Sequence, residues 1–148
     1  MRENIPDNVP RKLALVAWKE MGRMTLLKKT MLVVEDSPSQ AVIVQFMLEQ
    51  NEYQVLWAPN GKIGVLMAEE YLPDVIVMDA EMPEMNGFEA CKLLKDNKYT
   101  ANIPIIMMTA RSETDHVSKG MELGVSDFIP KDPFSTMVLL GSVRALLK

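Results

Sequence analysis

The sequence predicts an α/β protein in which helices cover both faces of a five-stranded parallel sheet, the arrangement called doubly wound. Short apolar segments alternate along the chain with segments whose apolar residues recur at helical spacing. Several of the apolar segments are continuous rather than alternating, which is typical of strands buried on both faces. Right-handed crossovers between parallel strands then place helices on both sides of the sheet.

These two patterns assign the elements in chain order. The expected strands are the segments 31–34, 53–58, 75–78, 103–108 and 127–129. The expected helices are the segments 38–50, 61–71, 87–95, 113–123 and 133–147. In the last helix a set of apolar residues can share one face, namely Phe134, Met137, Val138, Val143 and Leu146.

Length and composition limit the possible classes of protein. The chain has 148 residues, enough for one domain, and 48% of them are hydrophobic, which is enough for a core. No apolar stretch is long enough to span a membrane, so a cytoplasmic domain is expected. The single cysteine, Cys91, excludes an internal disulfide and a cysteine-rich zinc site, and the single histidine, His116, excludes a multi-histidine metal site.

Charge is distributed unevenly along the chain and suggests a boundary near residue 30. Residues 1–30 hold seven Lys and Arg against three Asp and Glu, a net charge of +4, whereas the remaining residues hold nine against seventeen, a net charge of −8. We therefore expect a basic leader over residues 1–29, helical or disordered, and one domain over residues 30–148. Because the acidic domain repels phosphates, direct binding of nucleic acid is not expected.

Polar residues follow four of the expected strands at the point where each strand ends. Glu35 and Asp36 follow the first strand, Asp79 the third, Thr109 the fourth and Lys131 the fifth. Carboxyl ends of parallel strands lie at one edge of a sheet, where folds of this kind bind their ligands. Each residue alone has an ordinary explanation, such as a solvated acidic pair, a surface lysine or a helix cap. Their joint placement at strand ends predicts a functional site.

The residue types indicate phosphoryl chemistry. Three neighbouring carboxylates repel one another unless a cation lies among them, and oxygen ligands without His or Cys favour Mg²⁺. A carboxylate beside Mg²⁺ can attack phosphorus and form an acyl phosphate. The ammonium of Lys131 and the hydroxyl of Thr109 can then stabilise the phosphoryl oxygens.

Four motifs resemble those of the receiver domains of two-component response regulators. They are Val-Val-Glu-Asp-Ser at 33–37, Val-Met-Asp-Ala-Glu-Met-Pro-Glu-Met-Asn-Gly at 77–87, Met-Thr-Ala-Arg at 108–111 and Asp-Phe-Ile-Pro-Lys at 127–131. The resemblance covers about residues 30–148 and is most specific in the segment 79–87. It implies a CheY-like, flavodoxin-like fold with the strand order 2-1-3-4-5.

The resemblance also implies roles for the acidic residues. Asp79 would be the phosphoacceptor, receiving phosphate from a sensor histidine kinase or a phosphotransfer protein. Glu35, Asp36 and Asp79 would hold Mg²⁺ together with the backbone carbonyl of Glu81. Such a domain catalyses only its own phosphotransfer and dephosphorylation, so a conventional enzyme is not expected.

Signalling would depend on the residues at the ends of the fourth and fifth strands. By the resemblance, Thr109 and Lys131 would contact the phosphoryl group, and Phe128 takes the position of the aromatic switch residue. Phosphorylation would draw the Thr109 hydroxyl inward and let Phe128 rotate. This would change a surface formed by the fourth helix, the fifth strand and the fifth helix, which would bind a downstream protein or a second copy of the chain.

Three local features lead to further expectations. Asp132 separates Lys131 from Pro133, where the family pattern has proline directly after lysine, so we expect a trans Lys131–Asp132 bond and Asp132 as the N-cap of the last helix. Glu81 and Arg111 lie two residues beyond Asp79 and Thr109, and they could pair across the opening of the site. Finally, the sequence stops directly after the last helix: a complete chain would be a stand-alone receiver, whereas an excised one would lack its output part.

Three other functions share parts of these features. A flavodoxin-like FMN protein needs a phosphate-binding loop after the first strand, but carboxylates occupy that place here. An aspartate-nucleophile phosphatase would suit the Asp79-Ala80-Glu81 spacing, although no cap-domain insertion is present in the sequence. A phosphorylation-independent interaction module is the third alternative, and the intact set of acidic residues, threonine and lysine argues against it.

Overall fold

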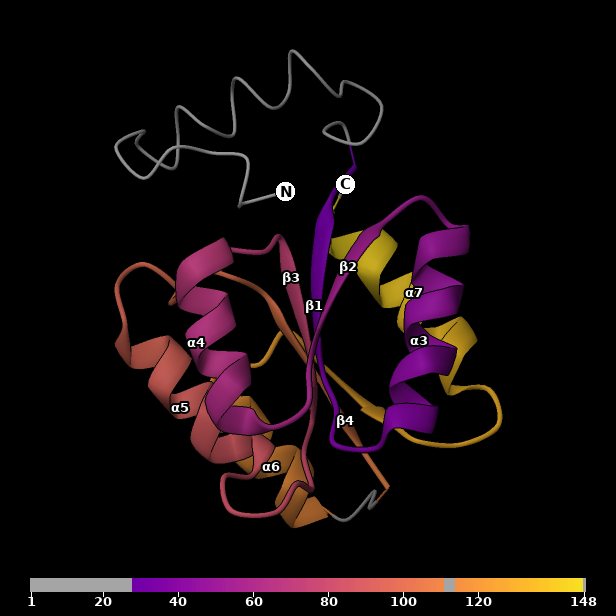
Figure 1. The fold of residues 1–148 in the computed structure, drawn as a ribbon. Coiled ribbons are helices and arrows are strands. Elements are labelled where there is room, and N and C mark those ends of the chain that lie inside the picture. The colour runs from indigo at the N-terminus through magenta and orange to yellow at the C-terminus, as the bar shows by residue number, and fades with distance from the viewer. Residues whose placement is uncertain (1–27, 111–113, 148) are drawn as a thin grey trace, which may run out of the picture.

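A five-stranded parallel sheet forms the centre of the molecule (Figure 1). The computed structural model describes residues 28–110 and 114–147. Its strands are β1 (Thr30–Val34), β2 (Gln54–Ala58), β3 (Val75–Asp79), β4 (Ile105–Thr109) and β5 (Asp127–Pro130), in the order β2-β1-β3-β4-β5. Its helices are α3 (Pro38–Gln50), α4 (Gly61–Tyr71), α5 (Gly87–Asp96), α6 (Thr114–Glu122) and α7 (Ser135–Leu146). The predicted fold class and strand order are confirmed.

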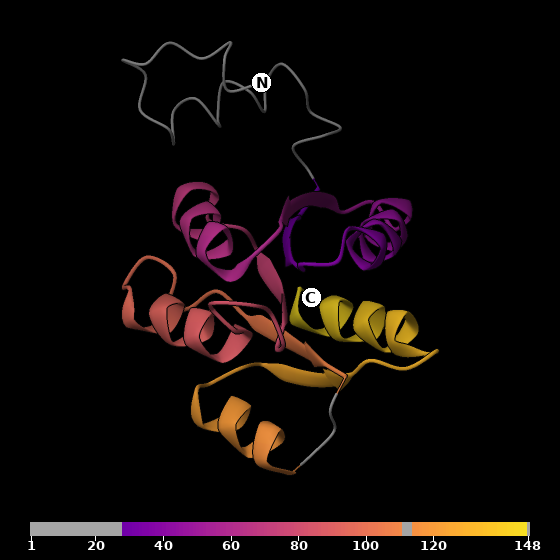
Figure 2. The ribbon, with the colours of Figure 1, turned by 60° about the horizontal axis from the view of Figure 1, so that its bottom comes forward.

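Helices cover both faces of the sheet. Helices α3 and α7 lie on one face and α4, α5 and α6 on the other, as both ribbon views show (Figures 1 and 2). Alternate residues of β1 divide between two cores. Met31 and Val33 pack with α3 and α7, while Leu32 and Val34 pack with α4 and α5. This explains the continuous apolar strands, because a strand covered on both sides has no face left for polar residues.

Side-chain caps define where two helices next to the predicted site begin. The Ser37 side chain accepts a hydrogen bond from the N–H of Gln40, and Pro38 begins α3. Asn86 and Glu89 form a reciprocal capping box at the start of α5. The predicted bounds of α3 and α4 agree with the structure, whereas β4 begins two residues later than expected, after Pro104.

The start of α7 differs from the expectation. The Lys131–Asp132 bond is trans, as expected, since the described residues contain no cis peptide. However, α7 begins at Ser135, and its N-cap residue Phe134 makes no side-chain capping bond. Asp132 instead accepts a hydrogen bond of 2.7 Å from the N–H of Phe134. Its carboxylate therefore closes a turn before the helix, because a short Asp side chain bonds readily to the backbone two residues later.

The predicted apolar face of α7 is also wrong in part. Val143 is fully buried and Leu146 packs partly against the same core, but Phe134, Met137 and Val138 are all exposed. Leu139, which was not in the predicted set, is the other fully buried residue of this helix. The sheet therefore contacts a face rotated from the expected one, which leaves an apolar strip in solvent.

Two further expectations concern the ends of the chain and the membrane. Most of the predicted leader, residues 1–27, lies outside the described residues, so its conformation and the domain boundary stay predictions. Among residues 28–110 and 114–147, no helix is long and apolar enough to cross a membrane.

Gly87 and Gly141 provide a matched test of this packing. A Cβ on Gly87 would overlap the Asp79 carbonyl and lie 2.9 Å from the Met107 sulfur, whereas a Cβ on Gly141 would meet nothing within 4 Å. We expect Gly87→Ala to lower the free energy of unfolding by about 1–3 kcal/mol through overpacking. Gly141→Ala should raise it by up to about 1 kcal/mol through helix propensity. Urea denaturation of both variants measures this, and equal effects would contradict the assigned packing.

Candidate functional site

The carboxyl ends of four strands bring the predicted site residues to one edge of the sheet. Glu35 and Asp36 directly follow β1, and Asp79 is the last residue of β3. Thr109 is the last residue of β4, and Lys131 directly follows β5. Parallel pairing of β3 with β4 sets Asp79 opposite Met108, and pairing of β4 with β5 sets Thr109 opposite Pro130. Sheet register, rather than proximity in sequence, therefore assembles the site.

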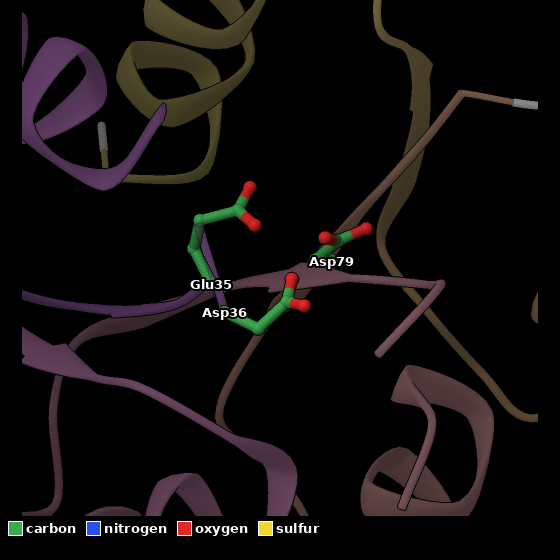
Figure 3. A group of neighbouring side chains, drawn as sticks. All are labelled: Glu35, Asp36 and Asp79. Atoms are coloured by element: carbon green, nitrogen blue, oxygen red, sulfur yellow. The ribbon is translucent and has the colours of Figure 1, made fainter. Parts of the chain in front are cut away.

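Three carboxylates converge at this edge (Figure 3). Glu35, Asp36 and Asp79 each place an oxygen within 4.8 Å of the others. Glu35 and Asp79 are buried, with only 6% of each residue exposed, whereas Asp36 is exposed. The cluster therefore has two desolvated carboxylates and a third at its mouth.

Lys131 lies against the two buried carboxylates. Its Nζ is 2.9 Å from Oε1 of Glu35 and 3.1 Å from Oδ2 of Asp79. The Nζ also donates a hydrogen bond of 2.8 Å to the side-chain oxygen of Gln40, in the first turn of α3. Sequence reasoning missed Gln40, although its place just after the Ser37-Pro38 helix start was a usable signal. One ammonium therefore has three oxygen partners.

Remaining hydrogen bonds orient the two buried carboxylates. The second oxygen of Glu35 accepts from the N–H of Ser37 at 3.2 Å, and Oδ1 of Asp79 accepts from the N–H of Glu81 at 3.1 Å. The indole Nε1 of Trp57 on β2 donates to the backbone carbonyl of Glu35 at 2.8 Å. Sequence reasoning also missed Trp57, because only the pairing of β1 with β2 places it beside the cluster.

Burial and mutual repulsion perturb the pKa values in this cluster. Burial raises the pKa of Asp79 to about 7, with further contributions from the hydrogen bond and charge of Glu35, while Lys131 opposes the shift. Burial alone would raise the pKa of Glu35, but hydrogen bonds from Lys131, Asp79 and Ser37 outweigh it and lower that pKa. Although burial disfavours the ammonium, contacts with Glu35 and Asp79 hold the pKa of Lys131 above its usual value. The two buried carboxylates therefore compete for one cation.

The donor set fits a hard divalent cation. When all three carboxylates are ionised, they leave two negative charges in excess of the one ammonium, and every candidate ligand atom is an oxygen. Within the described part of the chain, the Asp36 carboxylate has no hydrogen-bond or ion-pair partner, and it faces Asp79 (Figure 3). Glu35, Asp36 and Asp79 are thus the residues that could hold a metal ion.

Glu81 makes a contact that the sequence did not suggest. Its carboxylate accepts the Thr109 hydroxyl at 2.9 and 2.8 Å to its two oxygens, and it accepts the N–H of Ala110 at 2.9 Å. The expected partner, Arg111, lies outside the described residues, so the pairing of Glu81 with Arg111 stays a prediction. Glu81 therefore joins the loop after β3 to the end of β4.

Phe128 packs toward α5 and α6. Its ring stacks on Phe88 with a centroid distance of 6.4 Å and an interplanar angle of 22°. A Cβ on Gly120 of α6 would lie 2.9 Å from this ring, so glycine makes the close approach of the helix possible. Phe128 thus connects β5 with the helices on one face of the sheet.

Comparisons with known proteins agree with this geometry. Residues 31–144 match the family model described as the response regulator receiver domain. The chain is 40% identical over 117 residues to the protein PilH of Pseudomonas aeruginosa, covering 78% of this chain and 95% of PilH. It is 37% identical over 122 residues to the alkaline phosphatase synthesis transcriptional regulatory protein PhoP of Bacillus subtilis, covering 82% of this chain and 50% of PhoP.

Solved structures show the same architecture. The chemotaxis protein CheY4 of Vibrio cholerae has a TM-score of 0.75 and 28% sequence identity, with 80% of this chain and 98% of that chain covered. The chain spans only half the length of PhoP but nearly all of PilH, so the match is to one domain. The chain belongs to the family of response regulator receiver domains of two-component systems, signalling domains that interact with histidine kinases and typically bind Mg²⁺.

Proposed function

We propose that this domain accepts a phosphoryl group on Asp79 from a phosphohistidine of a sensor kinase or phosphotransfer protein, and then switches a protein-interaction surface. The observation that carries this proposal is the buried carboxylate of Asp79, 3.1 Å from the Lys131 ammonium and clustered with Glu35 and Asp36. Asp79 is the member of this cluster that is itself the last residue of a strand and that also contacts the Lys131 ammonium.

The proposed step is a simple exchange of bonds at phosphorus. A carboxylate oxygen of Asp79 forms a bond to phosphorus, the bond from phosphorus to the imidazole nitrogen of the donor breaks, and the leaving imidazole takes up a proton. The product is an acyl phosphate on Asp79. Lys131 is placed to stabilise the phosphoryl oxygens, because its ammonium already contacts Asp79 and reaches it on a flexible stem.

A divalent cation fits the proposed step. Glu35, Asp36 and Asp79 would hold Mg²⁺, with the backbone carbonyl of Glu81 as a further ligand. The bound ion supplies positive charge for the phosphoryl oxygens and relieves the repulsion among the carboxylates.

The switch would run through the ends of β4 and β5. The Thr109 hydroxyl would turn toward a phosphoryl group on Asp79, and the space near Phe128 would change as a result. The Phe128 ring already stacks on Phe88, and it lies so near Gly120 that a Cβ there would be 2.9 Å from the ring, so a rotation of the ring alters the packing of α6. A switch of this kind biases an equilibrium between two surfaces rather than creating a new one.

The proposed output surface is formed by α6, β5 and α7. Its helices carry exposed apolar side chains, namely Val117 and Met121 on α6 and Met137 and Val138 on α7. Large exposed apolar side chains are common at interaction sites, and these lie on the two helices that precede and follow β5 in the chain. A downstream protein or a second copy of the chain would bind there.

Metal binding can be tested directly. Mg²⁺ should raise the melting temperature, because it binds the folded site and not the unfolded chain. In a Trp18→Phe background it should also change the Trp57 fluorescence, since the Trp57 indole bonds to the carbonyl of Glu35. Asp36→Asn should weaken Mg²⁺ binding by about tenfold or more, because it removes a ligand charge. Asp96→Asn, at the exposed end of α5, is the control, and equal affinities in both variants would contradict the site.

Phosphoryl acceptance has a mass-spectrometric test. Acetyl phosphate with Mg²⁺ should add one base-labile phosphoryl group to the protein, measured by intact mass. Asp79→Asn should abolish the addition, while the control Asp96→Asn should leave it intact. Equal labelling of all three proteins would show that the acceptor lies elsewhere.

Transmission to the output surface can be followed by NMR. On phosphorylation, amide shifts should extend from the Asp79 loop to Phe128 and α6. Thr109→Val should reduce the distant shifts and keep those near Asp79, because it lacks the hydroxyl that links the two regions. Thr109→Ser, which keeps a hydroxyl, should restore them. Shifts confined to the Asp79 loop in the unsubstituted protein would argue against the proposed switch.

A further inference from the structure

Glu81 occupies the hydrogen-bond donors that a phosphoryl group on Asp79 would need. Asp79 ends β3 beside Met108 of β4, and the next two residues of β4 and its loop present a hydroxyl and an N–H at the same edge. Both donors, the Thr109 hydroxyl and the Ala110 N–H, bond to the Glu81 carboxylate at 2.8–2.9 Å. The Glu81 carboxylate therefore occupies donors that could otherwise bind the oxygens of a phosphoryl group on Asp79.

From this contact we infer that Glu81 is a positioning residue that holds Thr109 in the unphosphorylated state and competes with the phosphoryl group for it. The inference rests on the proposed function of Asp79. A hydroxyl has only one proton, so Thr109 cannot donate fully to Glu81 and to a phosphoryl oxygen at the same time. Phosphorylation therefore requires Glu81 to release Thr109 and Ala110.

The backbone keeps Glu81 close enough to act in this way. The N–H of Glu81 bonds to Oδ1 of Asp79 at 3.1 Å, so Glu81 is tied to the phosphoacceptor itself. Its side chain is half-buried, and bonds to an ionised acceptor in such a place are stronger than bonds between neutral groups. Breaking them adds to the cost of phosphorylation, and reforming them helps to restore the resting state after the phosphate is lost.

The negative charge of Glu81 could also oppose phosphorylation by repulsion alone. An experiment must therefore distinguish this repulsion from competition for the Thr109 hydroxyl. A negative carboxylate near Asp79 repels any incoming anion, whether or not it bonds to Thr109. Repulsion alone would persist if the Thr109 hydroxyl were removed. Competition for the hydroxyl would disappear when the Thr109 hydroxyl is removed.

The test measures the affinity of the Mg²⁺-loaded full chain for beryllofluoride, which bonds to an aspartate carboxylate and presents fluorines in place of phosphoryl oxygens. Glu81→Ala should bind it about tenfold more tightly, since the resting bonds no longer have to be broken. The backbone carbonyl proposed as a metal ligand is kept in this variant. A second pair of variants controls for charge. Glu81→Gln and Glu84→Gln each remove one negative charge from the same loop, and Glu84→Gln, at an exposed position, should change the affinity for beryllofluoride much less.

A double-mutant cycle then identifies the route. The gain from Glu81→Ala should shrink severalfold in a Thr109→Val background, because the contested hydroxyl is absent from both states. The Ala110 amide proton should also shift in Glu81→Ala without ligand, as its carboxylate partner is lost. A gain in affinity cannot arise from a damaged fold, and melting temperatures recorded for each variant check the fold independently.

The outcomes separate the two proposals. If the unsubstituted protein does not bind beryllofluoride, or if Asp79→Asn binds it equally well, the proposed function fails. If the unsubstituted protein binds and Glu81→Ala binds no more tightly, the role of Glu81 is wrong. An equal gain with and without the Thr109→Val substitution also overturns it, because repulsion alone then explains the effect.

Discussion

Two buried carboxylates that share one ammonium form the constraint on which the rest of the site depends. Glu35 and Asp79 are almost fully buried, and Lys131 lies within 3.1 Å of both. Burial raises the pKa of Asp79 to about 7, whereas at Glu35 burial is outweighed by hydrogen bonds with Lys131 and Asp79, which lower its pKa, as expected when two carboxylates share one cation. The exposed carboxylate of Asp36 adds further negative charge at the mouth. Such an arrangement destabilises the resting protein and favours the binding of a cation.

The sheet maintains this unfavourable cluster by fixing its backbone. The strands β1, β3 and β4 are covered on both faces, and the register between strands places Asp79 and Thr109 at the same edge. The backbone at Glu35 and Asp79 cannot separate without moving β1 or β3 from cores that are tightly packed. The cost of the charge cluster is therefore met by burial of apolar surface elsewhere in the sheet.

The sequence predicts the backbone of this site well and its side-chain contacts poorly. Apolar segments stop at the site residues, so the strand ends are visible, and parallel register brings them together. The place of Trp57 beside the cluster depends on the pairing of β1 with β2, for which sequence spacing gives no signal, whereas Gln40 follows the Ser37-Pro38 helix start and could have been proposed from the sequence. In α7, Leu139 and Val143 pack in the core while other apolar residues stay in solvent, so periodicity could not distinguish the buried face of the helix from its exposed apolar residues. The start of that helix was misplaced because Asp132 can close a turn as well as cap a helix, and only backbone geometry decides between them.

Thr109 joins the charge cluster to the rest of the domain through two different groups. Its hydroxyl bonds to Glu81 beside Asp79, while its backbone carbonyl accepts the N–H of Lys131 at 2.6 Å. The hydroxyl can change partner without breaking the ladder between β4 and β5, so the sheet can stay intact while the local contact changes. The backbone of Lys131 is bonded to the end of β4 that carries this hydroxyl, and Phe128 lies three residues before Lys131, on β5. The proposed rearrangement at the acidic cluster would therefore reach α6 through adjacent residues of β4 and β5, without any need for the core to open.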